Sequence, residues 1–552
     1  MLIDLDGSAF QVLLSCTLRA TVRSTGLQSI GQTKPFPWSL WAWARSAYFV
    51  VKYLSFILEP HDLLIAISFG AFVLVFLGVG IYSGLNQKST AEDYLLASRE
   101  ANPWLTGLST MATGNSGFMF IGLIGFTYTL GVASVWIILG WIVGEAFAWN
   151  TVHHRLRHTS EQVDSATVVS YLSQEDKTSR WLTLTSGLIT IAFLAVYAAT
   201  QLQAGSKALS VIFGWDYNLG ILLGAVIVTI YCFAGGIRAS IWVGSIQATL
   251  MLISMLILVT VAVIHSGGPI GMFERLGESD PALLSLAPDS LQLGVIPFAL
   301  SWFVAGFGVV GQPHIMSRIM AIDSTKNVAI ARNIYLLLYV VFAISALGVG
   351  LTARVLLPEL LALGGDTELA LPELATTLLP ALLVGIVLSG IFAATISTAD
   401  AQLLTCSATL SQDIFHWASD SYRLVKAGTL VMALFILVIA LVGNDNVFAL
   451  ATIAWSTLAA GLGPLMVVRV WERAIKTPVA IAMMLVGVST ALTWRLGFGL
   501  SDSVCEAFPG MVAGALIYLI SLAFGGGEPA ESDDALVSVI DAQEPQEVAS
   551  SS

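Results

Sequence analysis

Residues 108–118 read LSTMATGNSGF, a run of small and polar side chains inside an otherwise apolar segment. Residues 305–313, which read AGFGVVGQP, interrupt a second apolar segment in the same way. Such interruptions free backbone groups from the helical ladder, and lipid tolerates this only where those groups line a cavity or meet a ligand. Close helix packing explains either patch alone equally well. The two interruptions lie five predicted spans apart, so each would open one of two five-helix units. This pairing indicates an inverted-repeat transporter with its site near the membrane midplane.

The composition of the chain is that of a polytopic membrane protein rather than a large soluble one. The 552 residues are 56% hydrophobic and 11% charged, with a mean hydropathy of +0.83. Thirteen apolar segments approach the length of about 20 residues that one span requires. They lie near residues 62–84, 104–128, 131–153, 181–204, 216–235, 239–264, 293–313, 334–357, 379–410, 427–444, 446–468, 477–496 and 508–526. We therefore predict an all-α membrane protein with about 13 transmembrane helices.

The basic residues set the orientation of these spans. If the first span ends inside the cell, fifteen Lys and Arg residues, Arg318 among them, fall in inner loops and four in outer loops or span ends. This bias predicts a multi-pass protein of the bacterial inner membrane with a cytoplasmic C-terminus. The tail, residues 527–552, carries seven acids and no base, a composition typical of disorder.

Residues 1–60 fit this scheme less well, because their five basic residues would lie on the outer side. Residues 37–58 are rich in Trp and Tyr and resemble an interfacial helix, and no secretory signal is evident. An interfacial extension and a misassigned start codon both stay open. We expect the transporter domain to span 61–526, with inverted repeats near 104–264 and 293–468.

Asp400 is an acid inside the apolar segment 379–410, where a carboxylate costs about 2.5–3.5 kcal/mol or more. Ser397 lies three residues earlier, on the same helical face. Hydroxyl, carbonyl and carboxylate oxygens are what a hard cation or a proton requires, so we predict a coupling-ion site. A polar contact between packed helices is the alternative. For Glu145, also near bilayer depth, we expect a structural pairing with a basic or amide group on a neighbouring span rather than a role in proton movement.

Several short motifs resemble the sodium:solute symporter family, in particular its bacterial sodium/proline branch. The similarity covers about residues 62–526, and its motifs are YLLASR at 94–99, GG at 235–236 followed by Trp242 and Gln247, GQPHI at 311–315, and residues 393–406. The resemblance implies a leucine-transporter-like 5+5 inverted repeat with one span before it and two after it. That number agrees with the thirteen apolar segments.

The resemblance also implies that Na⁺ is the coupling ion. In the family the main sodium site uses three backbone oxygens and two hydroxyl groups from the broken second span and the ninth span. The matching positions here are Ala112, Asn115, Ala394, Ser397 and Thr398. All five can supply the required oxygen atoms.

Two acids of the proline branch are missing, because this chain has Gly114 and Gly244 in their places. In some relatives the second of these acids helps form a second sodium site with hydroxyls of the ninth span, one of which falls at Asp400. We therefore expect Asp400 to form a second ion site or a proton site. Its carboxylate, on the ninth span, would replace the missing acid of the sixth span from the opposite side of that site.

The resemblance places the solute pocket around eight residues: Ser116, Gly117, Phe118, Tyr197, Ala305, Phe307, Val309 and Gln312. The proline branch has bulkier aromatic residues at Phe118, Ala305 and Val309. Loss of ring surface predicts a larger or differently shaped cavity. An amino acid such as proline is the expected solute.

No phosphate-binding loop, zinc spacing or nucleophile elbow is visible, so we expect neither an enzyme nor an ATP-driven pump. Nothing in the chain suggests a nucleic-acid partner; the expected partners are a small solute and the bilayer, and no feature indicates an oligomeric state. The predicted function is Na⁺-coupled symport. A proton-coupled or uncoupled permease using Asp400 and a transporter-like solute sensor remain as alternatives.

Overall fold

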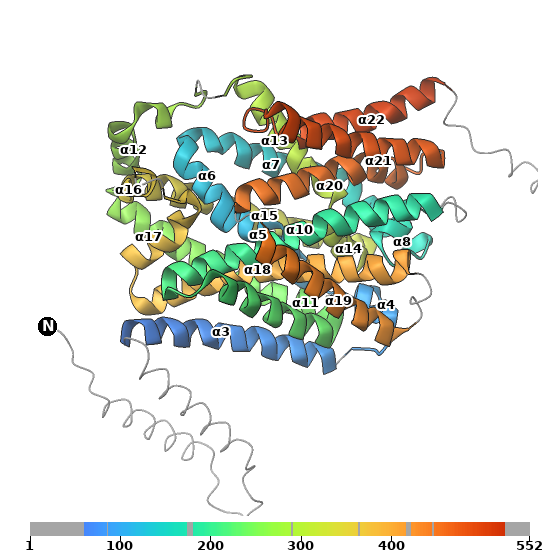
Figure 1. The fold of residues 1–552 in the computed structure, drawn as a ribbon, viewed down its shortest axis with the longest axis horizontal. Helices are drawn as coiled ribbons and strands as arrows, with labels where there is room; N and C mark the ends of the chain where they lie inside the picture. Colours follow the sequence, from blue (N-terminus) through green and yellow to red (C-terminus); the bar gives the residue numbers. More distant parts are fainter. Residues whose placement is uncertain are drawn as a thin grey trace, which may run out of the picture. The chain divides into compact units, whose positions relative to one another are not determined.

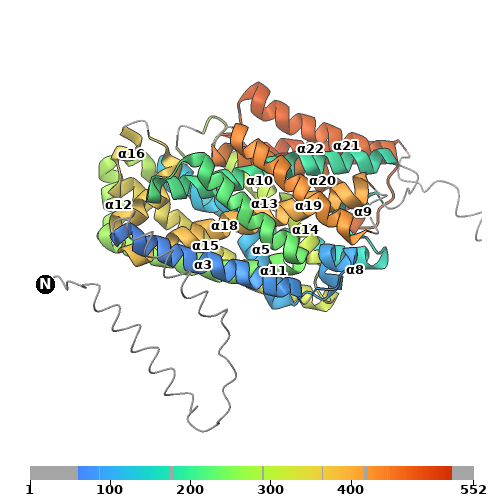
Figure 2. The same ribbon diagram turned by 60° about the horizontal axis from the view of Figure 1, so that its bottom comes forward.

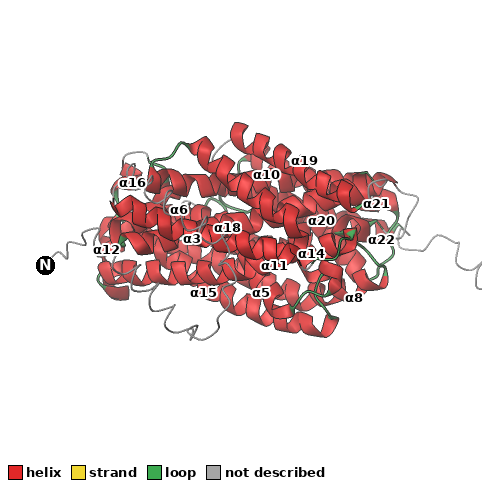
Figure 3. Ribbon diagram, turned by 90° about the horizontal axis from the view of Figure 1, so that it is seen from below, coloured by secondary structure: helices red, strands yellow, loops and turns green. Residues whose placement is uncertain are grey.

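The structure is a computed structural model, and it describes residues 60–85, 87–173, 180–288, 291–362, 365–415, 421–443 and 446–524. In these ranges the regular elements are all helical, and the β contact is a single bridge between Ala101 and Ile322 (Figure 3). Residues up to Leu63 and residues from Leu64 form two units, and the following description concerns the second. The predictions for residues 1–59 and for the acidic tail lie outside the described residues.

The helices follow one another along the chain with short connections (Figure 1). Their bounds are α3 Pro60–Leu85, α4 Ala91–Leu96, α5 Pro103–Gly117, α6 Leu123–Leu130, α7 Val135–Ala148, α8 His154–Gln162, α9 Val168–Leu172, α10 Arg180–Phe213, α11 Tyr217–His265, α12 Gly268–Ser279, α13 Val295–Phe307, α14 Pro313–Met320, α15 Val328–Leu356, α16 Glu359–Ala362, α17 Ala370–Leu378, α18 Ala381–Ala408, α19 Tyr422–Val442, α20 Val447–Val470, α21 Thr477–Leu492 and α22 Ala507–Ala523.

Within the described residues, nine helices are long and apolar enough to cross a membrane, or ten when a bent pair is counted as one span. Two of the nine, Pro103–Gln162 and Tyr217–His265, have 60 and 49 residues, enough for two passes each. The first turns at Gly131 (φ 70°), and the second at Gly236 (φ 54°). All thirteen predicted spans overlap helices once the shorter α22 is included. The prediction of an all-α membrane protein is confirmed.

Helix α18 lies at the centre of this unit. It packs against α5, α10 and α11, and its most apolar window is 83% buried, against 28% for the corresponding window of α21. Helix α3 runs along the outside, where Gly80 and Gly84 lie against Tyr231 and Ala234 of α11 (Figure 2). The helix with the predicted ion ligands is therefore well shielded from lipid.

The first predicted interruption lies at the end of α5. Asn102 caps the start of this helix, since its side chain accepts hydrogen bonds from the amides of Trp104 and Leu105, an arrangement that satisfies donors of the first turn. The backbone leaves helical geometry at Ser116 (φ 40°, ψ 179°). A single π-helical turn, Phe118–Gly122, then leads into α6. The predicted break is confirmed.

The second predicted interruption separates α13 from α14. A 3₁₀ turn, Gly308–Gly311, follows α13, and Gln312 is extended (φ −102°, ψ 95°). Pro313 then occupies the first turn of α14, where its missing N–H costs no hydrogen bond. The two helices meet at 55°. Both interruptions predicted from the sequence are therefore present.

The sharp turn inside α11 depends on glycine. Gly236 has φ 54° and ψ −144°, and a Cβ there would lie against the carbonyl oxygen of Tyr94. We expect Gly236→Ala to destabilise the protein by at least about 1–3 kcal/mol and to lower the thermal unfolding midpoint in detergent. Gly78→Ala is the control, because a Cβ at Gly78 meets nothing within 4 Å. Equal midpoints for the two variants would show that the turn does not require glycine.

Candidate functional site

Oxygen atoms of α5 and α18 converge just before the break in α5. The hydroxyl of Ser397 donates to the carbonyls of Ala112 (3.1 Å) and Ala394 (3.0 Å). The hydroxyl of Thr398 donates to the carbonyls of Thr113 (2.9 Å) and Ala394 (3.1 Å). All five residues are buried. The structure thus brings together four of the five residues proposed as sodium ligands.

Asn115, the fifth proposed ligand, is engaged within its own helix. Its carbonyl accepts the amide of Phe118, and its side-chain amide donates to the carbonyl of Met111 (2.8 Å). Thr113 takes the corresponding position beside α18, because its hydroxyl also donates to the carbonyl of Ser397 (3.2 Å). Thr113 was not among the ligands expected from the sequence, although it lies in the same polar patch.

This arrangement suits a hard monovalent cation. The converging groups are neutral hydroxyl and carbonyl oxygens, which such ions accept in place of water. A hydroxyl can rotate to present a lone pair instead of its proton, so Ser397 and Thr398 can serve the helix carbonyls or an ion. The residues present therefore fit Na⁺.

Asp400 lies two residues farther along α18 and is fully buried. One carboxylate oxygen accepts the hydroxyl of Ser240 (2.7 Å) and the guanidinium of Arg318 (3.2 Å). The other accepts the hydroxyl of Tyr231 (2.6 Å). Arg318 also contacts the hydroxyl of Ser109. The carboxylate therefore already has a positive partner and two hydroxyl donors.

This geometry changes the interpretation of Asp400. A Cβ on Gly244 would lie 2.5 Å from the hydroxyl of Ser109, and this hydroxyl contacts Arg318. An acid at position 244 would therefore lie near the same guanidinium that Asp400 binds. A second ion at Asp400 would compete with Arg318 at 3.2 Å. The second ion or proton site stays a prediction. The placement of Arg318 in an inner loop is wrong, because the side chain is 1% exposed and pairs with Asp400.

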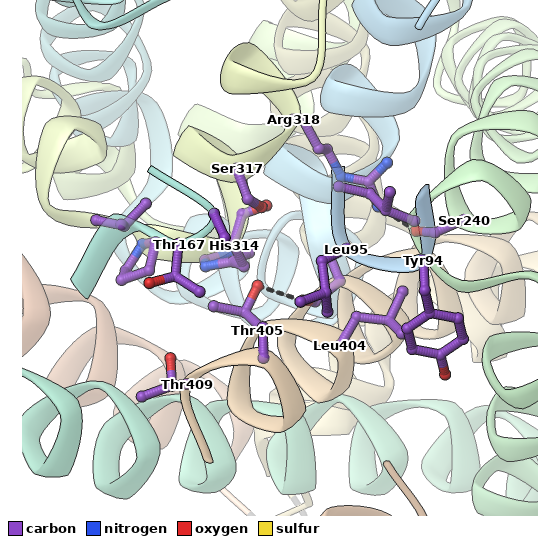
Figure 4. A pocket seen from close by; sticks show the side chains of 16 residues that line it. Tyr94, Leu95, Thr167, Ser240, His314, Ser317, Arg318, Leu404, Thr405 and Thr409 are labelled. Carbon is purple, nitrogen blue, oxygen red and sulfur yellow. Dashed lines mark hydrogen bonds between the residues drawn. The ribbon is translucent and has the colours of Figure 1, made fainter. Parts of the chain in front are cut away.

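A small pocket of about 30 Å³ reaches Arg318 of this ion pair. Figure 4 shows Arg318 and Ser240 at one part of its wall and Thr167 and Thr409 at another. His314 lies between them, and both of its ring nitrogens are buried without a hydrogen-bond partner among the described residues. Loop charges assign this end of the helices to the inner side. The pocket therefore leads from the predicted inner side toward Asp400.

Four of the residues predicted to bind solute meet at the break in α5. The hydroxyls of Ser116 and Tyr197 lie 3.2 Å apart, and the amide of Gly117 donates to the side chain of Gln201 (2.7 Å). The ring of Phe118 follows directly and is buried. Hydroxyl and amide groups thus face α10 at the residues that follow the proposed sodium ligands.

The predicted solute residues of the second break meet α20. Trp455 donates its indole N–H to the carbonyl of Ala305 (2.8 Å), and its own carbonyl accepts the side-chain amide of Gln312 (2.9 Å). Val309 is buried in the 3₁₀ turn between them. Phe307 is placed differently, because its ring packs on Phe147 (5.5 Å). It also lines an apolar groove with residues of α20 and α22.

Aromatic rings from helices not expected at the site cover this region. Trp141 of α7 stacks on Phe118 (5.4 Å between centroids) and lies 4.9 Å from the ring of Trp455. Phe448 of α20 stacks on the same Phe118 (5.4 Å) and on Phe126 (4.6 Å). The small residue Ala305 therefore has the indole of Trp455 at its carbonyl. The larger or differently shaped cavity stays a prediction, and neither tryptophan was expected at the site from the sequence.

Known proteins resemble this chain along most of its length. A sequence model of the sodium:solute symporter family matches residues 94–487. The chain is 30% identical over 453 residues to the high-affinity proline transporter of Bacillus subtilis (strain 168), covering 80% of this chain and 94% of that protein. It is 33% identical over 447 residues to the sodium/proline symporter of Haemophilus influenzae, covering 78% of this chain and 88% of that protein.

Among solved structures, a Na⁺-coupled sialic acid symporter in a substrate-bound outward-open state matches with a TM-score of 0.68 at 19% identity. The match covers 83% of this chain and 98% of that chain. Similarity at this level of identity concerns the fold alone. It confirms the predicted leucine-transporter-like fold; the exact bounds of the two repeats stay a prediction.

The buried ion pair between Arg318 and Asp400 generates a stability prediction. Asp400→Asn and Arg318→Gln each leave one buried charge alone, so we expect each to destabilise the protein by about 3–5 kcal/mol. The double variant leaves no lone charge and should lose much less than the sum of the two. Unfolding of the purified protein in mixed micelles measures these differences. Additive losses would show that the two side chains are not coupled.

Proposed function

The chain belongs to the sodium:solute symporter family, and we propose from this premise that it moves a small organic solute across the membrane together with Na⁺. The observation that carries the proposal is the contact of Ser397 and Thr398 with the carbonyls of the broken helix α5. A site made of neutral oxygens at a helix break has the donor set that Na⁺ requires. The protein is a multi-pass membrane protein, and we propose that its C-terminal tail is cytoplasmic.

The position of the two proposed sites explains how ion and solute would be coupled. The carbonyls of Ala112 and Thr113 face α18, while Ser116 and Gly117, a few residues later, face α10. An ion that fixes the first pair also fixes the backbone conformation that presents the second. Binding at one site then favours binding at the other, and this free-energy coupling is reciprocal.

We propose an amino acid as the solute, with proline as the best-supported example. The relatives described above are named as proline transporters, and the groups at the break are suited to a small zwitterion. The Ser116 hydroxyl and the nearby amides can bind a polar head group, while Trp141 and Phe448 provide flat apolar surface on either side of Phe118. Aromatic surface contributes strongly to binding a compact apolar ring.

Uptake by proteoliposomes tests the transport proposal directly. With purified protein and labelled proline, an inwardly directed Na⁺ gradient should drive accumulation, and replacement of Na⁺ by K⁺ should abolish it. Unlabelled proline should compete, whereas a sugar of similar size should not. Accumulation driven equally well by a proton gradient without Na⁺ would contradict sodium coupling.

The sodium site has its own test in the double variant Ser397→Ala with Thr398→Ala. It removes two of the proposed ligands, each worth about 1 kcal/mol or more, so the half-saturating Na⁺ concentration should rise by about tenfold or more. Ser389→Ala is a matched control, because its buried hydroxyl donates within α18 to Gly385 (2.7 Å). Unchanged Na⁺ dependence in the double variant would show that the ion binds elsewhere.

A further inference from the structure

Glu145 is a fully buried acid of α7 whose contacts are all neutral. One carboxylate oxygen accepts the indole N–H of Trp141 (2.8 Å), and the other contacts the hydroxyl of Tyr335 on α15. In the described part of the chain no Lys, Arg or His lies within salt-bridge distance of it. The structure thus pairs Glu145 with an indole of its own helix and a hydroxyl of α15, not with the expected basic or amide group, and leaves its charge without a counter-charge.

Most other buried acids of the described residues differ from Glu145 in this respect. Four of them form ion pairs with a Lys or Arg side chain, namely Asp93, Glu368, Asp400 and Glu506. Asp413 binds the hydroxyl of Thr167 (2.9 Å), and its main-chain carbonyl accepts the guanidinium of Arg180 (2.6 Å). A buried carboxylate left alone is costly, and such residues within membrane spans are typically functional. Glu145 therefore calls for an explanation beyond packing.

Tyr335 connects Glu145 to the break in α5. A Cβ built on Gly114 would lie 2.9 Å from the hydroxyl oxygen of Tyr335, so this hydroxyl covers the backbone of Gly114. The preceding residue is Thr113, whose carbonyl accepts the hydroxyl of Thr398. A single hydroxyl group thus separates the Glu145 carboxylate from the peptide next to the proposed sodium ligands.

The proposed ligands of the sodium site carry no negative charge, so a nearby carboxylate would strengthen Na⁺ binding. Its hydroxyl and carbonyl oxygens are neutral, and the nearby Asp400 is balanced by Arg318. A cation in a water-poor interior is stabilised by a carboxylate even without direct contact, because Coulomb interactions are weakly screened there. At position 114, where the proline branch carries an acid, this chain has a glycine.

We propose that Glu145 is the counter-charge of the sodium site and acts through Tyr335 as a positioning residue for Na⁺ binding. The carboxylate stabilises the bound ion electrostatically, and Tyr335 holds the carboxylate beside the Gly114 backbone. This inference rests on the proposed sodium site between α5 and α18. It assigns to α7 and α15 a part in ion binding that their sequences alone do not indicate.

Glu145→Gln tests the proposal, because the amide keeps the volume of the side chain and can still accept from Trp141. We expect the half-saturating Na⁺ concentration to rise by about tenfold, with maximal uptake retained at saturating Na⁺. Equilibrium binding, read as the Na⁺-dependent rise in the unfolding midpoint in detergent, should shift equally. Glu506→Gln is the control: it removes a buried acid paired with Arg495 (2.7 Å) and should leave the Na⁺ dependence unchanged.

A relocated carboxylate provides a rescue that a merely structural role would not permit. In the triple variant Glu145→Gln, Tyr335→Phe and Gly114→Asp, the lost hydroxyl makes room for an acid at position 114. Na⁺ affinity should recover at least part of the tenfold loss. If Glu145→Gln does not fold, Glu145→Asp and Glu145→Asn form a second pair of equal size, and the charged variant should bind Na⁺ more tightly.

The results separate this inference from the proposed function. Unchanged Na⁺ affinity in Glu145→Gln, or equal affinities of the Asp and Asn variants, would overturn the role of Glu145. If the Ser397 and Thr398 double variant still shifts the Na⁺ dependence in that case, the sodium site stands. If uptake needs no Na⁺ in the unmodified protein, the proposed function itself fails.

Discussion

The structure depends on one constraint, which is that carbonyl groups freed at the break in α5 must find partners inside the bilayer. The hydroxyls of Ser397 and Thr398 on α18 provide them. Because an unsatisfied carbonyl in lipid costs several kcal/mol, these contacts fix the deeply buried helix α18 against the broken one. Beyond the break, the Ser116 hydroxyl meets Tyr197 of α10 instead. A single irregularity of the backbone therefore builds two adjoining polar sites.

Charged side chains add a second layer of constraint. The pair between Asp400 and Arg318 joins α18 to α14, and Glu368 binds Lys207 of α10 (2.7 Å). Removing one member of such a pair is far more costly than removing both, so each pair holds its helices in a defined register. Glu145 stands apart, since its partners Trp141 and Tyr335 are uncharged. Among the described buried acids without an ion pair, Glu145 is the one that lies beside the backbone of α5 through Tyr335.

Much of this architecture could be predicted from local sequence. Apolar length identified the spans, and Gly and Pro identified both breaks, because each signal is local. The position of Arg318 near the end of an apolar segment suggested a loop. In the structure Arg318 lies on α14, and its side chain forms an ion pair with Asp400. Trp141 and Trp455 lie far from the breaks in sequence and reach them only through helix packing, so no local signal marked them. Thr113 could have been found, since the break exposes its carbonyl as much as that of Ala112.

Two pockets adjoin the proposed sites, one beside α20 and one on the predicted inner side. Beside α20, Glu368 accepts the amides of Val447 (3.0 Å) and Phe448 (2.6 Å), so the positive end of the α20 dipole is held in place. The Phe448 ring then lies over Phe118. Opening there requires α20 to lose bonds to a buried carboxylate. A pocket of about 240 Å³ adjoins Glu368 and Phe448, whereas the pocket that reaches Arg318 has a volume of only about 30 Å³. The larger free volume therefore lies beside α20, and the ring of Phe448 lies between that pocket and Phe118.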